Sequence, residues 1–221
     1  MKKVTNHKGW VTAIFSIIPF FIFTAIFQAM GLGISSALGD RGIINFNFDK
    51  YLELEDSLRN YLVADTIIQY LDLIGIFFLL WILMKFIDKE PFINLGFSIK
   101  GKANDIILGM TLGLLLMSVG YSILILLGEI KFIGFNYDLK SIILLFILFI
   151  GVSVVEETYV RGYVLKNLLK SFNPIVSLII SSAIFSFLHF LNPNVNYIAL
   201  TELFIAGILL GVSYVYTKNL W

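Results

Sequence analysis

Long apolar runs separated by short polar segments make up most of the chain. A helix needs about 20 predominantly apolar residues to cross the hydrocarbon core of a bilayer, and runs near this length recur along the sequence. The pattern predicts six membrane-spanning helices, at residues 10–37, 62–87, 105–128, 141–155, 174–191 and 197–216. We therefore expect an all-α, polytopic transmembrane helix bundle with about six spans.

The composition agrees with lipid as the main solvent of the chain. Hydrophobic residues make up 58% of the 221 residues, charged residues only 14%, and the mean hydropathy is +0.90. Soluble domains carry about 25% charged residues. We divide the chain into residues 1–140, with three N-terminal transmembrane helices and no assignable motif, and residues 141–221, which hold the candidate chemistry.

Charge and residue types exclude several classes of function. The net charge is +1 and no basic stripe is present, so no nucleic-acid partner is expected. The chain has no cysteine, which excludes disulfides, thiolate metal sites and a cysteine nucleophile.

The positions of Lys and Arg predict the orientation in the membrane. With the N-terminus inside, eleven of the 16 Lys and Arg residues fall in cytoplasmic segments and five in external ones. We therefore expect both the N- and the C-terminus of this integral membrane protein to lie in the cytoplasm. The bias toward Ile, Lys, Asn and Phe over Pro is typical of an AT-rich genome, and we expect a bacterial plasma membrane as the location.

Ionisable residues inside a membrane span are expensive, so each is a candidate for function. The densest group is Glu156, Glu157 and Arg161. Glu157 and Arg161 are four residues apart, so they can pair on one face of a helix, while Glu156 points about 100° away. Arg161 can then hold Glu157 ionised and leave Glu156 free for acid–base work.

His189 is the histidine that can join these carboxylates. Asn173-Pro174 predicts a helix break, because proline cannot continue a helix and restricts the residue before it. Glu157 precedes Asn173 by 16 residues and His189 follows it by 16, so a hairpin returns them to the same depth. Each residue alone has a bland interpretation as a structural ion pair or a packing histidine. Together they could activate a water molecule.

Glu156-Glu157-x-x-x-Arg161, followed by Phe185-x-x-x-His189, resembles the first two motifs of the CPBP family. This family comprises the CAAX proteases and bacteriocin-processing enzymes, is also called the Abi family, and includes the type II CAAX prenyl endopeptidases. The late stretch from Gly207-x-x-x-Gly211 to Trp221 is similar as well. The resemblance covers about residues 141–221.

The resemblance implies an intramembrane endopeptidase in which Glu156 and His189 are catalytic, with Glu157 and Arg161 in support. The substrate would be a membrane-associated peptide or protein, either prenylated or carrying a leader. Glu156 and His189 could hold a zinc ion, but catalytic zinc needs three protein ligands plus water. A metal-free glutamate mechanism is equally compatible, and the oligomeric state is open.

The family pattern includes a third motif, His-x-x-x-Asn, which does not appear before Trp221. We therefore expect this 221-residue form to be weakly active or inactive. Two other functions fit the same bundle. One is a non-catalytic bacteriocin immunity protein, and the other is a transporter subunit in which Glu156, Arg161 and His189 line an ion path.

Two glycine pairs have the spacing of close helix contacts, Gly109-x-x-x-Gly113 and Gly207-x-x-x-Gly211. Small residues at this spacing let helices approach each other in membranes. We interpret both pairs as packing sites.

Overall fold

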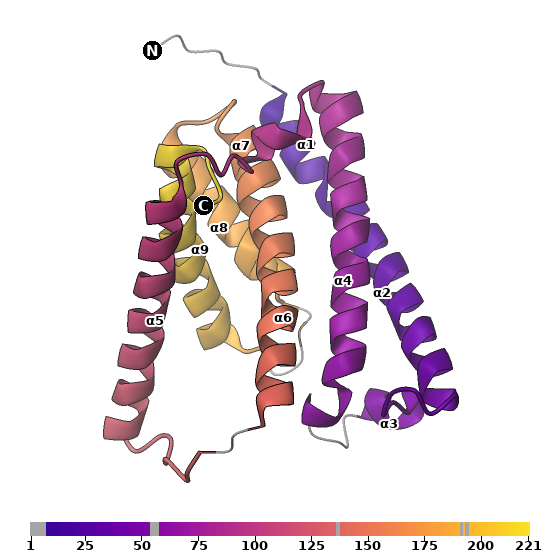
Figure 1. Cartoon of the computed structure of the whole chain (residues 1–221). Helices are drawn as coiled ribbons and strands as arrows, with labels where there is room; N and C mark the ends of the chain where they lie inside the picture. The colour runs from indigo at the N-terminus through magenta and orange to yellow at the C-terminus, as the bar shows by residue number, and fades with distance from the viewer. Residues whose placement is uncertain (1–7, 54–57, 136–137, 191, 193–194) are drawn as a thin grey trace.

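The computed structural model describes residues 8–53, 58–135, 138–190, 192 and 195–221, and within these ranges it contains helices and no strand. Figure 1 shows a bundle of long helices joined by short loops. In chain order the elements are α1 (Gly9–Phe15), α2 (Ile17–Asp40), α3 (Phe48–Glu53), α4 (Leu58–Ile82), the π-helix η1 (Leu83–Asp88), the 3-10 helix η2 (Phe92–Leu95), α5 (Ala103–Leu126), α6 (Leu139–Glu156), the π-helix η3 (Glu157–Leu165), α7 (Lys166–Leu168), α8 (Pro174–Leu188) and α9 (Tyr197–Thr217).

The helical membrane bundle expected from the hydrophobic pattern is confirmed. Five helical segments in the described part are long and apolar enough to cross a bilayer: Gly9–Asp40, Tyr61–Asp88, Ala103–Leu126, Leu139–Leu168 and Tyr197–Thr217. The remaining predicted span, 174–191, is the shorter α8 of 15 residues; its helix ends at Leu188, and residue 191 lies outside the described part.

The fourth span extends further than predicted. The two glutamates interrupt the apolar run of 141–155 that defined the predicted span, but the helix continues from α6 through Glu156 into η3 and α7 as far as Leu168. The glutamates do not end the helix because each meets a partner inside the bundle, as described below.

Asparagines set the starts of the two helices that follow. The side chain of Asn173 accepts a hydrogen bond from the Val176 N–H at 2.9 Å and caps α8, with Pro174 in the first turn. This residue pair is a strong helix-start signal, since the side chain satisfies a free N–H and the proline lacks one. Asn196 caps α9 in the same way through the Ala199 N–H at 2.9 Å. The predicted break at Asn173-Pro174 is confirmed.

Small residues allow the close helix contacts. Helix α2 packs on α4, α4 on α6, and α8 on α9 (Figure 1). At Gly207 in α9, an added Cβ would lie 3.0 Å from the Cα of Ser182 in α8, and one at Gly211 would lie 2.5 Å from Leu178. The interpretation of Gly207 and Gly211 as packing residues is confirmed.

Helix α5 behaves differently. None of its residues is buried, and a Cβ at Gly109 or Gly113 would meet nothing within 4 Å in the described part of the chain. The interpretation of Gly109-x-x-x-Gly113 as a packing site within this chain is therefore wrong. Glycine spacing alone does not show that a second helix lies opposite.

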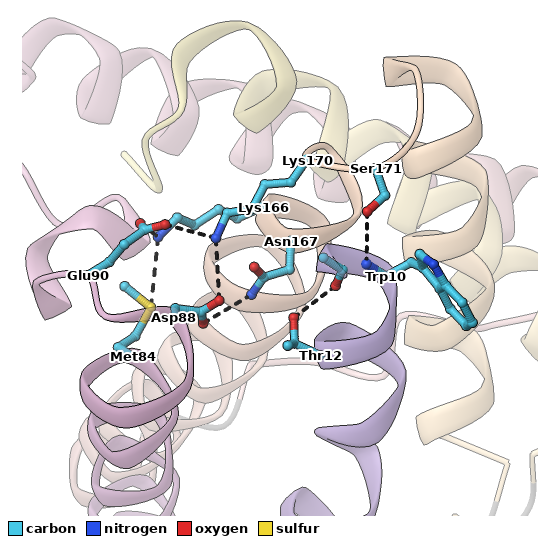
Figure 2. Close-up of polar contacts among 10 residues, drawn as sticks. Trp10, Thr12, Met84, Asp88, Glu90, Lys166, Asn167, Lys170 and Ser171 are labelled. Carbon is cyan, nitrogen blue, oxygen red and sulfur yellow. Dashed lines mark hydrogen bonds and ion pairs between the residues drawn. The ribbon is translucent and has the colours of Figure 1, made fainter. Parts of the chain in front are cut away.

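A polar cluster joins the end of the N-terminal helices to the segment after η3 (Figure 2). Lys166 and Lys170 donate to the two carboxylate oxygens of Glu90, at 2.6 and 2.8 Å. Lys170 also reaches Asp88 at 3.4 Å, and the Asn167 amide donates to the other Asp88 oxygen at 3.4 Å. We call these five residues the lysine clasp. It fixes the end of η1 against α7.

The start of α1 is held at the same place. The Trp10 N–H donates to the Ser171 hydroxyl at 3.1 Å (Figure 2). A Cβ at Gly9 would lie only 2.4 Å from the Asn167 carbonyl oxygen. Together with the lysine clasp, these contacts tie α1, η1 and α7 into one end of the bundle. Trp221 lies at this end too (Figure 1).

Two glycines of α2 provide a matched test of helix packing. At Gly31 a Cβ would come within 2.7 Å of the Ile68 backbone, whereas at Gly33 it would meet nothing within 4 Å. We expect Gly31→Ala to lower the free energy of unfolding by about 1–3 kcal/mol through overpacking. Gly33→Ala should leave it unchanged or raise it by up to about 1 kcal/mol, because alanine favours helix. Thermal unfolding in detergent measures both; equal effects would contradict the packing of α2 on α4.

The lysine clasp predicts a dependence of stability on pH. Burial alone would raise the pKa of Glu90, but the hydrogen bonds and charges of Lys166 and Lys170 outweigh it and lower the pKa from 4.5 to about 2. A lowered carboxyl pKa stabilises the fold above the unfolded value, and this contribution is lost as the pH falls from about 4.5 to about 2.

We expect Glu90→Gln to lower the free energy of unfolding by about 1–3 kcal/mol at pH 7, since it removes charge-assisted hydrogen bonds. The difference from the unchanged protein should shrink as the pH approaches about 2, where Glu90 itself is protonated. Thermal unfolding across this pH range measures it. Glu129→Gln, at an exposed loop position, is the control. A difference that stays constant down to pH 2 would contradict the clasp.

Candidate functional site

The site forms where α6 changes into the π-helix η3. Glu156 is the last residue of α6 and Glu157 the first of η3. The periodicity argument assumed a regular α-helix here, and this detail is wrong, because residues 157–165 have the wider π turn. Local π turns are frequent at functional sites. The neighbouring glutamates nevertheless take different partners, as the sequence predicted.

Glu157 pairs with Arg161. Their Oε1 and Nη1 atoms lie 3.2 Å apart, and the Arg161 side chain is only 1% exposed. The guanidinium also lies over the Phe185 ring, 4.4 Å from its centroid, in a cation–π contact. An arginine this deep needs a nearby anion to offset its lost hydration. Glu157 supplies that anion.

Glu156 meets His189 across the hairpin. The Glu156 Oε1 and His189 Nε2 atoms lie 3.3 Å apart, with side chains 33% and 19% exposed. The other ring nitrogen, Nδ1, lies 2.9 Å from the Phe185 carbonyl oxygen. A carbonyl can only accept, so Nδ1 carries a proton and the histidine presents Nε2 to Glu156. The predicted meeting of these two residues at one depth is seen directly.

Phe185 connects the two pairs. Its ring lies under Arg161, its carbonyl oxygen holds His189, and the Phe185 and His189 ring centroids are 4.9 Å apart. The motif Phe185-x-x-x-His189 placed both residues on one helix face, but the sequence did not predict that Phe185 would contact Arg161. The spacing of four residues from His189 was the one signal for its role.

Tyr159 holds the site against the N-terminal helices, which sequence reasoning missed. Its ring stacks on Phe20 with centroids 4.0 Å apart, and its hydroxyl lies 3.1 Å from the Ser16 hydroxyl. Tyr159 is fully buried. Ser16 and Tyr159 are separated by 143 residues, so nothing in the local pattern could pair them.

The described residues do not complete a zinc site. Glu156 and His189 converge and could supply two ligands, but the described part of the chain brings no group of three or more His, Cys, Asp or Glu residues together. A catalytic zinc needs three protein ligands.

Comparison with protein families gives a match to the C-terminal part of the chain. The model of the type II CAAX prenyl endopeptidase Rce1-like family matches residues 138–221. We call these matched residues, 138–221, the Rce1-like domain. This match agrees with the resemblance to the CPBP family and supports an intramembrane protease in general. The Rce1-like domain includes both glutamates, Arg161 and His189.

Comparison with curated proteins and with solved structures gives no match. The family match begins at residue 138, so α1 to α5 lie outside it. From this N-terminal part, Ser16 and Phe20 contribute to the site by packing against Tyr159.

The two glutamates of the Rce1-like domain should differ in their effect on stability. Glu157→Gln leaves the buried Arg161 without an anion, and we expect it to lower the free energy of unfolding by about 3–5 kcal/mol. Glu156→Gln should lower it by less than about 1 kcal/mol, because Glu156 is partly exposed and glutamine can still hydrogen-bond to His189. Thermal unfolding of the two variants measures this; equal losses would contradict the separate partners.

Proposed function

We propose that the chain is an intramembrane endopeptidase in which Glu156 activates water for attack on a peptide bond. The observation that carries the proposal is the contact of 3.3 Å between Glu156 and His189 from two helices of the Rce1-like domain. The family match supports this class of activity. A carboxylate and an imidazole within hydrogen-bond reach are a general base and its orienting partner.

The reaction divides into two proton transfers. Glu156 takes a proton from a water molecule as the water oxygen bonds to the carbonyl carbon of the scissile peptide. The protonated Glu156 then gives this proton to the peptide nitrogen as the carbon–nitrogen bond breaks. His189, fixed by the Phe185 carbonyl, orients Glu156 and the water. The products are a free carboxylic acid and a free amine.

Glu157 and Arg161 support this chemistry without taking part in proton transfer. Their mutual pairing leaves Glu156 free of the arginine, and Arg161 holds Phe185 in position through ring stacking. We propose a substrate that reaches the site from the bilayer, a peptide that is membrane-associated through a prenyl group or carries a leader. We further propose that both termini of the chain lie in the cytoplasm, with cleavage near that side.

A cleavage assay in proteoliposomes tests the proposal. The substrates are a farnesylated C-terminal peptide, the same peptide without the lipid, and a leader peptide, each with a fluorophore and quencher across the expected cut. We expect Glu156→Gln to reduce the cleavage rate by about 10²–10⁴-fold, the usual effect of losing a general base. Glu202→Gln in α9 should leave the rate unchanged.

A cleavage rate that survives Glu156→Gln would contradict the proposal and would favour a protein that binds peptides or transports ions. Because the third motif does not appear before Trp221, the comparison uses the low rate expected of this 221-residue form. Repeating the assay with a zinc chelator tests whether a metal takes part.

A further inference from the structure

A second polar site lies at the end of the bundle that holds the lysine clasp. A cavity of about 570 Å³ opens between η2, α7 and the end of α9. Its polar lining includes Glu90, Asn94, Ser98, Lys166, Lys218 and Asn219. Glu156 and His189 are not among its lining residues, so it is separate from the proposed catalytic site.

Tryptophans mark the end of the bundle where we expect the headgroups of a bilayer. Trp10, Trp81 and Trp221 are all partly exposed, and each belongs to a segment at this end of the bundle (Figure 1). Tryptophan gathers at the boundary between hydrocarbon and headgroups. The Trp221 ring packs beside Phe97 in the loop that carries Ser98, with centroids 6.4 Å apart. The cavity wall is therefore part of this interfacial belt.

The charges around the cavity favour an anion. Glu90 would repel one, but Lys166 and Lys170 hold both of its oxygens, and Lys170 also pairs with Asp88. The two negative charges of the clasp acids are balanced by the two positive charges of its lysines. Lys218 adds one positive charge, and it has no ion pair among the described residues.

Neutral hydrogen-bond donors face the same space. The side chains of Asn94 and Ser98 line the cavity and make no hydrogen bond to another described residue, so the Asn94 amide and the Ser98 hydroxyl are free to donate. Asn219 fixes the wall: its amide donates to the Ser98 carbonyl at 2.7 Å and its carbonyl accepts from the Trp221 N–H at 2.8 Å. One cation and two neutral donors around a cavity suit a phosphate group.

The backbone at Lys218 determines which substitution can test its side chain. Lys218 caps α9 with φ +53°, and among the described residues Lys89 at φ +55° is the one other non-glycine with positive φ. Glycine is the usual residue at such a helix end, because a Cβ costs free energy there. Glycine can therefore replace Lys218 without backbone strain.

We propose that this cavity binds the phosphate group of an anionic phospholipid, with Lys218 as the cation and Asn94 and Ser98 as neutral donors. Lys166 lines the same cavity and stays paired with Glu90. The lipid tails would extend along the apolar surface below the tryptophan belt. The bound headgroup would then join η2, α7 and the end of α9, next to the lysine clasp.

Native mass spectrometry of the full chain in detergent tests the proposal with phosphatidylglycerol, phosphatidylcholine and inorganic phosphate as probes. The key variant is Lys218→Gly, because glycine suits positive φ and the fold is kept. Lys89→Gly is the matched control: it removes a lysine with the same backbone conformation from the neighbouring cavity that Trp81 and Lys85 line. Thermal unfolding confirms that both variants remain folded.

We expect the unchanged chain to retain phosphatidylglycerol over phosphatidylcholine, and Lys218→Gly to weaken this binding about fivefold, the contribution of one lysine at an anionic surface. Lys89→Gly should bind as the unchanged chain does. If inorganic phosphate binds as strongly as the lipid and loses this binding in Lys218→Gly, that result supports the phosphate site and assigns it to a soluble ligand. Equal losses in both variants, or no loss in either, would overturn the proposal.

Discussion

Charge neutralisation inside the membrane is the constraint on which the Rce1-like domain depends. Two adjacent glutamates follow a long apolar helix, and an unpaired carboxylate there would be costly. In the fold, Glu157 lies 3.2 Å from Arg161, and Glu156 lies 3.3 Å from His189. These pairs let the fourth span continue past its charges to Leu168 and place α8 beside η3. The contacts that stabilise these charges within the span also create a site with a partly exposed carboxylate.

Contacts from the N-terminal helices hold the hairpin formed by η3, α7 and α8. At the end near α1, the lysine clasp fixes α7, where the chain turns toward α8. Deeper in the bundle, Tyr159 stacks on Phe20 and contacts Ser16, so the N-terminal helices touch the segment that carries Glu157 and Arg161. Ser16 and Phe20 lie outside the family match, yet their side chains contact Tyr159 of η3. Helix α5 stands apart, with every residue outside the buried core.

The parts predicted from the sequence follow from local rules. The lengths of the apolar runs predicted the membrane spans, and Asn173-Pro174 predicted the turn. The equal spacing of Glu157 and His189 from that turn predicted that the glutamates and His189 would lie together. The lysine clasp was not predictable, because Glu90 and Lys166 are 76 residues apart and no local pattern relates them. Gly109-x-x-x-Gly113 and Gly207-x-x-x-Gly211 share one spacing, and their environments differ because only α9 has a helix packed against it.

The central claim is that Glu156 and His189 work as one unit, and a double-mutant cycle on the cleavage rate tests it most directly. The rates to compare are those of the unchanged chain, Glu156→Gln, His189→Gln and the double variant in proteoliposomes. Residues that act together are strongly non-additive, so the double variant should be no slower than the slower single variant. Losses that multiply, or a His189→Gln variant as fast as the unchanged chain, would contradict the account.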